Sequence, residues 1–514
     1  MCPGNEREVI VESEGLISQV VEEECENVGD GEGITLSSSN TTVFHHRLSF
    51  KEVTQDLRSL MKIVWPMTTT TLLLHSKSVV SMLFLGHLGN SQLAGGSLAI
   101  SFANITGYSV IKGLSMGMDP ICCQAYGAKK LSVISHTFQR TFCLLLFSAI
   151  AIASLWLNME PILLLLRQDP DIVEVAKLYL RCSIPELLAQ VHLHPLRSFL
   201  RTQTITKPLT IFTSVCLALH LPINYFLVIY FKLGVKGVAL ASACNTINLD
   251  LSILTYLIWT NDVAVKPWDG LTLISPFQGW KALLSLALPS VLSVCLEWWW
   301  YEIMLFFCGI LENPQASVAA MGILIQTTGL LYVFPHALSM GLSTRIGHEL
   351  GADNPQRAQR IAVIGLVSAI ALGVAAFLFT VAVRSVWGKM YTSEDEILKL
   401  VAIALPVLGF CEIGNCPQTA LCGVLTGSAR TKSGAKINFI AFYVVGLPVA
   451  LGMAFGFKVG FVGLWVGLAA AQVACMGMMI RTLMTTDWKH QAKRSEELTR
   501  TAEDANDLET ALLS

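Results

Sequence analysis

The sequence predicts an all-helical, multi-pass membrane protein. Of its 514 residues, 53% are hydrophobic and only 14% are charged, and the mean hydropathy is +0.57. Apolar stretches of about 20 residues, the length that a helix needs to cross about 30 Å of hydrocarbon, recur along most of the chain. An internal duplication divides these stretches into two sets of six. We therefore expect twelve transmembrane helices in two six-helix lobes, related by a pseudo-two-fold axis along the membrane normal.

The chain divides into two tails, two lobes and a connecting loop. Residues 1–54 are polar and acidic, which predicts a disordered cytosolic tail. The N-lobe is expected over 55–262 and the C-lobe over 282–485, and the aromatic residues of 263–281 favour a loop along the membrane interface. Residues 486–514 start basic and end acidic, which predicts a solvated cytosolic tail. The expected spans are 59–85, 92–118, 133–157, 173–198, 205–231, 236–260, 282–310, 317–343, 360–384, 397–426, 435–457 and 459–483.

The duplication appears as short motifs that recur at a nearly constant interval. The sequence LSMG at 114–117 recurs at 338–341, an offset of 224 residues, and FK at 231–232 recurs at 457–458, an offset of 226. Because six is an even number, both copies enter the membrane from the same side, as in the parallel repeats of transporters. A cavity between two such bundles, opening to either face as they rock, is the architecture of alternating access.

Basic residues set the expected orientation. They are concentrated in the connections after the second, fourth, eighth and tenth spans, which places these loops and both termini in the cytosol. The sequence leaves open whether the membrane is the vacuolar membrane, another endomembrane or the plasma membrane. The basic residues in question are Lys129, Lys130, Arg197, Arg201, Lys207, Arg345, Arg357, Arg360, Arg430, Lys432 and Lys436.

Several function classes are excluded by what the sequence lacks. A net charge of −2 without a basic face argues against nucleic-acid binding. There is no G-x-x-x-x-G-K-[ST] loop for ATP and no G-x-S-x-G elbow for a hydrolase. The 14 cysteines lie in apolar segments without the spacing of a zinc site. We expect neither enzymatic activity nor a cofactor or metal, and we expect a proton gradient, in preference to a sodium gradient, as the driving force.

The apolar stretch 288–311 contains carboxylates at a depth where charge is costly. Glu297 precedes Trp298–Trp300, and Glu302 follows one and a half turns later. A charged carboxylate at the centre of a transmembrane helix costs about 2.5 kcal/mol or more, so such a residue normally faces a cavity or a partner. Burial also disfavours the charged form, so the group can bind a proton on one side and release it on the other. Glu297 is therefore the leading candidate for proton coupling.

A further intramembrane carboxylate, Glu412, lies in the tenth expected span. For Glu297 and Glu412 the alternative is a structural, hydrogen-bonded glutamate. Glu302 lies about 140° around the helix from Glu297, at about 100° per residue. For Glu302 the coupling role and the structural role both stay open.

Other residues inside the expected spans are candidates for a substrate cavity. Lys77 either pairs with a glutamate across the lobes, attracts an anionic cargo or extends toward the interface. The aromatic faces of Trp299 and Tyr301 suit flat or cationic solutes, with packing as the alternative. The remaining candidates are His75, Asn245 and Gln418, and for the two amides interhelical hydrogen bonding is the alternative.

Six segments, spread over both halves, carry a family resemblance. They are the stretch from Pro66 to Gly89 ending in FLGHLG, MDPICCQAYGAKK at 118–130, HPLRSFLRTQ at 194–203, CLEWWWYEI at 295–303, GLSTRIGHELGA at 341–352 and CEIGNCPQT at 411–419. Together they resemble the multidrug and toxic compound extrusion (MATE) transporters, in particular the plant detoxification branch. The resemblance covers about residues 55 to 485. It implies a twelve-helix, two-lobed antiporter that exports organic solutes in exchange for protons or sodium.

The resemblance also implies roles for individual residues. The acidic residue on the seventh helix of the family falls on Glu297, a second one nearby falls on Glu302, and the one on the tenth helix falls on Glu412. Bacterial members use an aspartate in the first helix, and this chain has Ser81 at that position. The resemblance therefore implies that the second lobe handles protons.

We expect a secondary transporter that exports organic solutes or xenobiotics in exchange for protons. Its partners are expected to be a small organic solute, the proton and membrane lipid, with no nucleic acid, and the chain is expected to be a monomer. One alternative is a passive channel or facilitator, and another is a membrane protein that binds partners without transporting. The charge of the cargo stays open, because glutamates favour cations and Lys77 favours anions.

Overall fold

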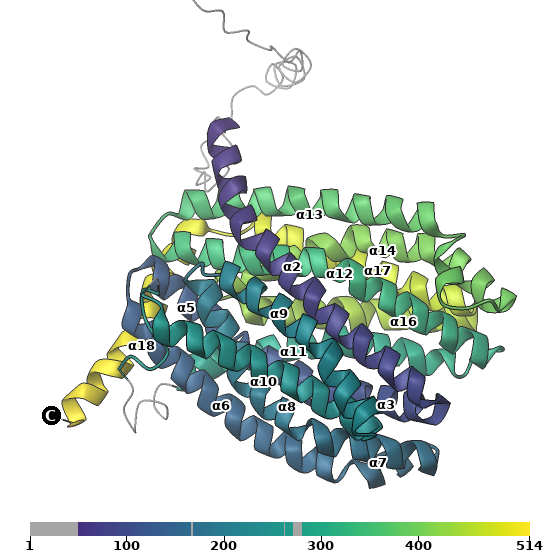
Figure 1. The fold of residues 1–514 in the computed structure, drawn as a ribbon. Helices are drawn as coiled ribbons and strands as arrows, with labels where there is room; N and C mark the ends of the chain where they lie inside the picture. Colours follow the sequence, from purple (N-terminus) through teal and green to yellow (C-terminus); the bar gives the residue numbers. More distant parts are fainter. Residues whose placement is uncertain (1–49, 166–167, 262, 271–279, 514) are drawn as a thin grey trace, which may run out of the picture. The chain divides into compact units, whose positions relative to one another are not determined.

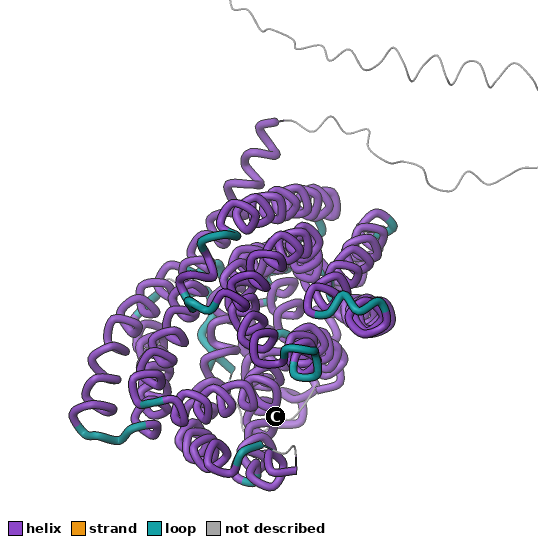
Figure 2. The backbone as a smooth tube through the Cα atoms, turned by 90° about the vertical axis from the view of Figure 1, so that its right-hand side faces the viewer, coloured by secondary structure: helices purple, strands orange, loops and turns teal. Residues whose placement is uncertain are grey.

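The computed structural model describes residues 50–165, 168–261, 263–270 and 280–513. These residues are almost entirely helical and contain no strand (Figure 2). The all-helical fold class is thus confirmed. Most of the expected N-terminal tail, 1–54, and about half of the expected connecting loop, 263–281, lie outside the described residues.

The N-lobe is built from the helices between residues 50 and 259. In Figure 1, α6, α8 and α10 run side by side, and α8 packs against α3, α6 and α10. The elements are α2 (Phe50–Leu88), α3 (Asn90–Ala103), η1 (Asn104–Tyr108), α4 (Ser109–Ser115), α5 (Met118–Gly127), α6 (Leu131–Leu157), α7 (Met159–Leu165), α8 (Pro170–Thr202), α9 (Lys207–Asn224), η2 (Tyr225–Tyr230) and α10 (Val235–Trp259).

The C-lobe follows from residue 280, and α14 lies at its centre. This helix packs against α12, α13 and α17, which is why it is among the most buried elements of the chain. The elements are α11 (Trp280–Cys308), α12 (Pro314–Gly351), α13 (Pro355–Val383), η4 (Trp387–Met390), α14 (Asp395–Gly427), α15 (Thr431–Phe439), η5 (Ile440–Gly446), α16 (Leu447–Leu451), η6 (Gly452–Gly456), α17 (Phe461–Met484) and α18 (Trp488–Leu513).

Ten helical stretches within the described residues are long and apolar enough to cross a membrane. The two other expected spans are less regular. The span 92–118 is made of α3, the π-helical turn η1 and α4. The span 173–198 lies inside α8, which is 33 residues long but carries several charged side chains. Helix α8 packs inside the N-lobe, mainly against α3, α6 and α10, whereas α4 packs mainly against α11 of the C-lobe.

The backbone repeats the internal duplication seen in the sequence. Six non-glycine residues in the described chain have a positive φ, a conformation that is uncommon for side chains with a Cβ. They form three pairs at intervals of 224, 225 and 226 residues: Lys129 with Asp353, Thr204 with Ala429, and Lys232 with Lys458. Because equivalent turns have the same rare conformation, the two lobes are copies of one helical unit.

The two lobes contact each other at several places, among them α2 with α12, α4 with α11, and a close seam. The seam joins α5 of the N-lobe to α12 of the C-lobe. A Cβ atom added to Gly127 would lie 2.1 Å from the carbonyl oxygen of His348, so only glycine permits this approach. The side chain of Gln124 donates a hydrogen bond across the seam to the carbonyl oxygen of Gly427 (2.9 Å).

Ion pairs join the lobes through α2 and α13. Asp56 of α2 is only 2% exposed, and its carboxylate accepts hydrogen bonds from the Nε atoms of Arg357 (2.9 Å) and Arg360 (2.7 Å) of α13. Glu52 also pairs with Arg360, at 2.5 Å. Because Asp56 is buried, these pairs resist separation of the lobes more than exposed pairs do.

The C-terminal segment differs from the expectation of a solvated tail. Residues Trp488–Leu513 form the helix α18, which packs against α5 and α6 and also against α12 and α13. One stripe of it is buried, at intervals of four and three residues that place side chains on one helix face. The buried residues of this stripe are Trp488, Ala492, Ser495, Thr499 and Ala502. The charge pattern was therefore a poor guide, because the charged side chains that the structure describes in 488–502 are exposed and leave the buried stripe uncharged.

Candidate functional site

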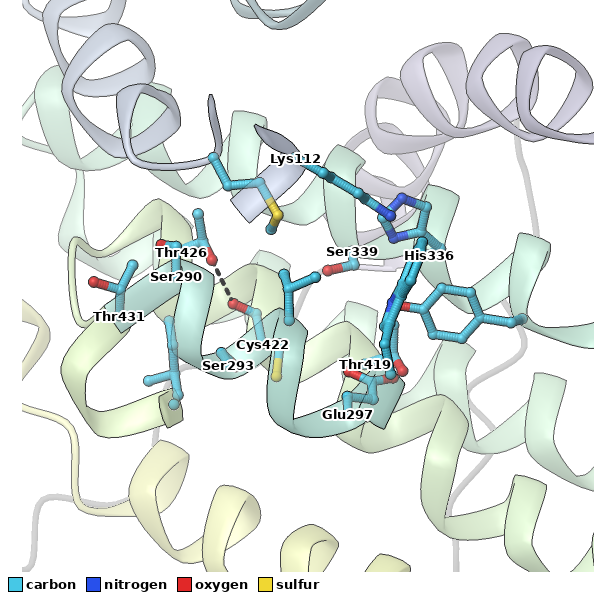
Figure 3. A pocket seen from close by; sticks show the side chains of 16 residues that line it. Lys112, Ser290, Ser293, Glu297, His336, Ser339, Thr419, Cys422, Thr426 and Thr431 are labelled. Carbon is cyan, nitrogen blue, oxygen red and sulfur yellow. Dashed lines mark hydrogen bonds between the residues drawn. The ribbon is translucent and has the colours of Figure 1, made fainter. Parts of the chain in front are cut away.

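A cavity lies between the lobes and is lined mainly by the C-lobe. Helices α11, α12, α14 and α15 form most of its wall, and α4 of the N-lobe supplies the rest. About 630 Å³ of space is free of protein atoms here, including open solvent at its mouth. Its polar lining residues, most of them labelled in Figure 3, are Lys112, Ser290, Ser293, Glu297, Tyr332, His336, Ser339, Thr419, Thr426 and Thr431.

Glu297, the leading candidate from the sequence, faces this cavity from α11. Its side chain is partly exposed to the cavity, and it forms no ion pair with any of the described residues. The fully buried Gln418 of α14 lies against its carboxyl group. The sequence therefore placed a carboxylate deep in a span, and the fold directs it into an interlobe space.

Charged and titratable groups surround Glu297 from four helices. The groups within electrostatic range are Lys112 of α4, Tyr332 of α12, Glu412 and Cys422 of α14, and Cys475 of α17. Of these, only Lys112 is a cation. A carboxylate without a salt-bridge partner in an apolar bundle has no fixed charge to balance it, so its charge depends on what else occupies the cavity.

Lys112 reaches the cavity because α4 approaches α11 closely. A Cβ atom added to Gly113 would lie 2.6 Å from the Cα atom of Val291, so the two helices are nearly in backbone contact there. The Nζ atom of Lys112 lies 5.0 Å from the centre of the Trp298 ring, a cation–π contact. Lys112 is near Glu297 without forming an ion pair with it.

Glu412 lies behind the cavity wall and is satisfied by hydrogen bonds. It is 1% exposed, and it accepts a hydrogen bond from the Nδ2 atom of Asn415 (2.9 Å) and a weaker one from the Sγ atom of Cys416 (3.9 Å). It forms no ion pair with the described residues. Glu412 therefore has the hydrogen bonds of a structural glutamate. It has no counter-charge among the described residues, which still permits a change of its protonation.

The tryptophan run and the residues after it divide among several environments. Trp298 lines the cavity, Trp299 is 42% exposed on the outside of the lobe, and Trp300 is 1% exposed and packs on Phe442. Tyr301 lies within electrostatic range of both Glu297 and Glu412. Glu302 is partly buried and does not line the cavity.

Lys77 belongs to the interior of the N-lobe. Its Nζ atom lies 2.7 Å from the carboxylate of Glu186 on α8 and 3.0 Å from the hydroxyl of Thr246 on α10. The pairing with a glutamate of the opposite lobe, one of three interpretations of this lysine, is thus not what the structure shows. Asn245 donates a hydrogen bond to the carbonyl oxygen of Cys216 (2.6 Å), which is the interhelical role. His75 lies near Gly329 of α12 in the other lobe.

A second buried ion pair of the N-lobe involves α5 and α8. Arg201 forms an ion pair with Asp119 at 2.6 Å, and Ser198 donates a hydrogen bond to the same carboxylate. Ser81, at the position of the bacterial aspartate, hydrogen-bonds with the ring of His220 (3.2 Å). Within the described residues, no group of three or more His, Cys, Asp or Glu side chains is arranged to hold a metal ion.

Of the residues that line the cavity, only Glu297 was predicted from the sequence, and four of the others matter most for its chemistry. They are Lys112, Trp298, Tyr332 and His336. Three of them could have been found from the sequence, because they are polar residues inside expected spans. Lys112 lies in the span 92–118, and Tyr332 and His336 lie in 317–343. Intramembrane polar residues are expensive and therefore informative, but only the packing of α4 on α11 brings Lys112 to the glutamate.

Comparisons with known proteins agree with this architecture. The model of the MatE family matches residues 66–226 and again 289–451, one copy in each lobe. Protein DETOXIFICATION 53 of Arabidopsis thaliana is 60% identical over 453 residues, which cover 88% of this chain and 93% of that protein. The chain belongs to the MatE family. Another relative of this MATE transporter, Protein DETOXIFICATION 48 of the same plant, is 53% identical and covers 88% of this chain and 84% of its own length.

Solved structures show the same fold. The eukaryotic MATE transporter AtDTX14 has a TM-score of 0.83 at 29% identity, covering 87% of this chain and 99% of that one. The Vibrio cholerae MATE transporter VcmN has a TM-score of 0.72 at 19% identity, covering 85% of this chain and 98% of its own, a likeness that shows the fold alone. The two-lobed architecture expected from the duplication is thereby confirmed.

Membership of the family decides the broad function. MATE transporters are multi-pass membrane proteins that bind and export small organic molecules, and they are not enzymes. The expected class of function, fold and membrane association is therefore confirmed for this chain. Which ion drives the export and which residues couple it do not follow from the comparisons.

Proposed function

We propose that this MATE transporter exports organic solutes in exchange for protons, with Glu297 as the coupling group and Glu412 as its partner. The observation that supports the proposal most directly is the position of Glu297. It is a carboxylate without a salt-bridge partner among the described residues, and it lines the cavity between the two lobes. A cargo and a proton can therefore reach the same group.

Competition at one carboxyl group is sufficient for exchange. A proton on Glu297 removes the negative charge and one hydrogen-bond acceptor site, so a cargo that depends on either binds more weakly. By reciprocity, bound cargo weakens proton binding by the same factor. If the lobes reorient with either cargo or a proton bound, each exported cargo molecule is exchanged for a proton that moves in the opposite direction.

Glu412 strengthens this linkage because it is buried away from solvent. It lies within electrostatic range of Glu297, and two nearby carboxylates repel each other when both are charged. A proton bound to either group therefore relieves the other. The hydrogen bonds from Asn415 and Cys416 hold the Glu412 carboxyl group in place within this pair.

The seam between the lobes supports alternating access. The ion pairs of Asp56 with Arg357 and Arg360 close one end of the interlobe space, and the distribution of basic loops predicts that this end faces the cytosol. We propose that this conformation faces away from the cytosol and that these pairs break when the cavity opens toward it. The membrane is an endomembrane, such as the vacuolar membrane, or the plasma membrane, and both termini are cytosolic.

The test is transport by the purified protein in liposomes under an imposed pH gradient. Three radiolabelled aromatic probes of one skeleton serve as cargo: para-methylbenzylamine as a cation, para-methylbenzoate as an anion and para-aminomethylbenzoate as a zwitterion. At least one probe is expected to accumulate on the acidic side above the level of protein-free liposomes. Glu297→Gln is expected to lower this gradient-driven accumulation by at least about tenfold, equivalent to about 1.4 kcal/mol.

The matched control is Glu312→Gln, the same chemical change at an exposed position after α11. It is expected to transport as the unchanged protein does. Accumulation that ignores the pH gradient, or that persists in Glu297→Gln at the control level, would overturn the proposal. Uptake that rises linearly with concentration without saturation would instead indicate a passive channel.

A further inference from the structure

Two cations next to the cavity have no ionic partner. Lys112 lines the cavity, and Arg197 of α8 lies within electrostatic range of it. Neither forms an ion pair with the described residues, and the Nε atom of Arg197 is buried without a hydrogen-bond partner there. Arginine stays protonated in proteins, so Arg197 remains a charge within the protein interior. Unpaired buried charge is strongly destabilising, which makes its presence informative.

Lys112 and Glu297 occupy opposite sides of the cavity. Figure 3 shows the side chains of Lys112 and His336 next to each other on one side and Glu297 on the other. Lys112 and Glu297 do not close on each other as an ion pair, although both side chains are long. Both side chains line the same cavity, so one bound molecule can contact both.

The wall between these two ends is aromatic and hydroxylated. Trp298 and Tyr332 line the cavity with ring surfaces, and the Nζ atom of Lys112 lies over the Trp298 ring. Serine and threonine hydroxyl groups line the remainder, among them Ser290 and Thr426. A flat ring fits the aromatic part of this wall, and its substituents find hydrogen-bond partners on the hydroxyl part.

We propose that the cavity takes amphoteric aromatic solutes, with an anionic group directed to Lys112 and a cationic group directed to Glu297. This inference rests on the proposed function and names the substrate class of the same cavity. The anionic end balances Lys112 and Arg197, which the protein itself leaves unpaired. The cationic end balances Glu297, for which the protein likewise supplies no ion-pair partner among the described residues.

This arrangement preserves exchange with protons. A proton on Glu297 removes its attraction for the cationic end of the cargo and also its repulsion of the anionic end. Coulomb energy falls with distance, so for ends about 3.5 Å and about 7 Å from the carboxylate the lost attraction is about twice the relieved repulsion. Protonation therefore weakens cargo binding overall, as antiport requires.

The experiment measures equilibrium binding of the same three probes to the purified protein in detergent, without any gradient. The zwitterion para-aminomethylbenzoate is expected to bind at least about tenfold more tightly than para-methylbenzoate or para-methylbenzylamine. Lys112→Gln is expected to raise the Kd of the zwitterion and of the anion by about tenfold while leaving the cation within about threefold. Glu297→Gln is expected to weaken the zwitterion and the cation and to spare the anion.

Two further variants separate charge from folding. Lys112→Arg keeps the charge and is expected to retain zwitterion binding, and Lys432→Gln removes an exposed lysine of α15 outside the cavity and is expected to change nothing. The inference is overturned if the cation binds as tightly as the zwitterion, or if Lys112→Gln weakens all three probes equally. Coupled transport of the cation alone would leave the proposed function standing and remove this inference. If the zwitterion binds as expected but uptake ignores the pH gradient, this inference stands and the proposed function is overturned.

Discussion

The two lobes share one fold and treat their intramembrane carboxylates in opposite ways. In the N-lobe, Asp119, Glu186 and Asp250 each have a basic partner, at 2.6, 2.7 and 2.7 Å respectively. In the C-lobe, Glu349 near the end of α12 also pairs, with Arg345 at 2.7 Å, but Glu297, Glu302 and Glu412, which lie within the expected spans, have no ion-pair partner among the described residues. The partners of the N-lobe carboxylates are Arg201, Lys77 and His192.

This difference separates structural charges from exchangeable ones. A carboxylate that touches a cation is held in its charged form, because losing the charge would leave the cation unpaired. A buried carboxylate without such a partner has no comparable reason to stay charged. Duplication supplied both lobes with the same scaffold, so the division of labour lies in side chains and not in the arrangement of helices.

Breaking a pair in the N-lobe is expected to have the largest effect. Glu186→Gln leaves Lys77 buried without its partner, and removal of one member of a buried pair costs about 3–5 kcal/mol. The melting temperature of the purified protein in detergent should fall clearly. Glu297→Gln, which removes a carboxylate that balances no cation directly, should leave it nearly unchanged.

The double variant Lys77→Met with Glu186→Gln provides the control. Removing both charges together should restore most of the lost stability, since neither is then left unpaired. If Glu186→Gln melts as the unchanged protein does, Glu186 is not held by Lys77. The statement that ion pairs hold the carboxylates of the N-lobe would then be wrong, and the contrast between the two lobes with it.

Hydropathy and spacing were enough to predict most of the fold. The twelve spans, the duplication and the glutamate on the seventh span all follow from local sequence, because a helix in lipid must be long and apolar and must satisfy its own backbone. The proline-containing helices also follow, and Pro66 and Pro289 lie inside α2 and α11.

What the sequence could not supply depends on contacts between distant segments. Lys112 acts beside Glu297 only because Gly113 lets α4 approach α11, and no periodicity records that approach. The sequence made Lys77 a candidate for the cavity. In the structure it forms an ion pair with Glu186 of α8. The packing of α18 was not predicted, because its buried stripe consists mostly of small residues and is interspersed with charged ones. The charged residues suggested a solvated tail.

The second prediction concerns Glu412 and is of intermediate size. Glu412→Gln removes the neighbour that links the two C-lobe carboxylates, while Gln keeps much of the shape and can still accept a hydrogen bond from Asn415. Gradient-driven uptake in liposomes should fall by about tenfold, about 1.4 kcal/mol. Zwitterion binding at equilibrium should change by less than about threefold, because Glu412 does not line the cavity.

An equal loss of binding and of coupled uptake would contradict this assignment. It would place Glu412 in the binding site and not behind it. Asn415→Asp offers a further check at the same position, because a second carboxylate beside Glu412 adds repulsion. The pair then binds one proton more readily, so uptake in that variant should persist with a less acidic compartment.

The smallest effect is expected at Glu302, and it decides how far the contrast between the lobes extends. Glu302 lacks an ion-pair partner among the described residues, as Glu297 does, yet it does not line the cavity and is partly exposed. If lack of a partner were enough for coupling, Glu302→Gln would impair uptake as Glu297→Gln does. If access to the cavity is also needed, the change in gradient-driven uptake should stay within about twofold, or about 0.4 kcal/mol. We expect the second result, because Glu302 does not line the cavity and, unlike Glu412, it is not acted on by the charge of Glu297.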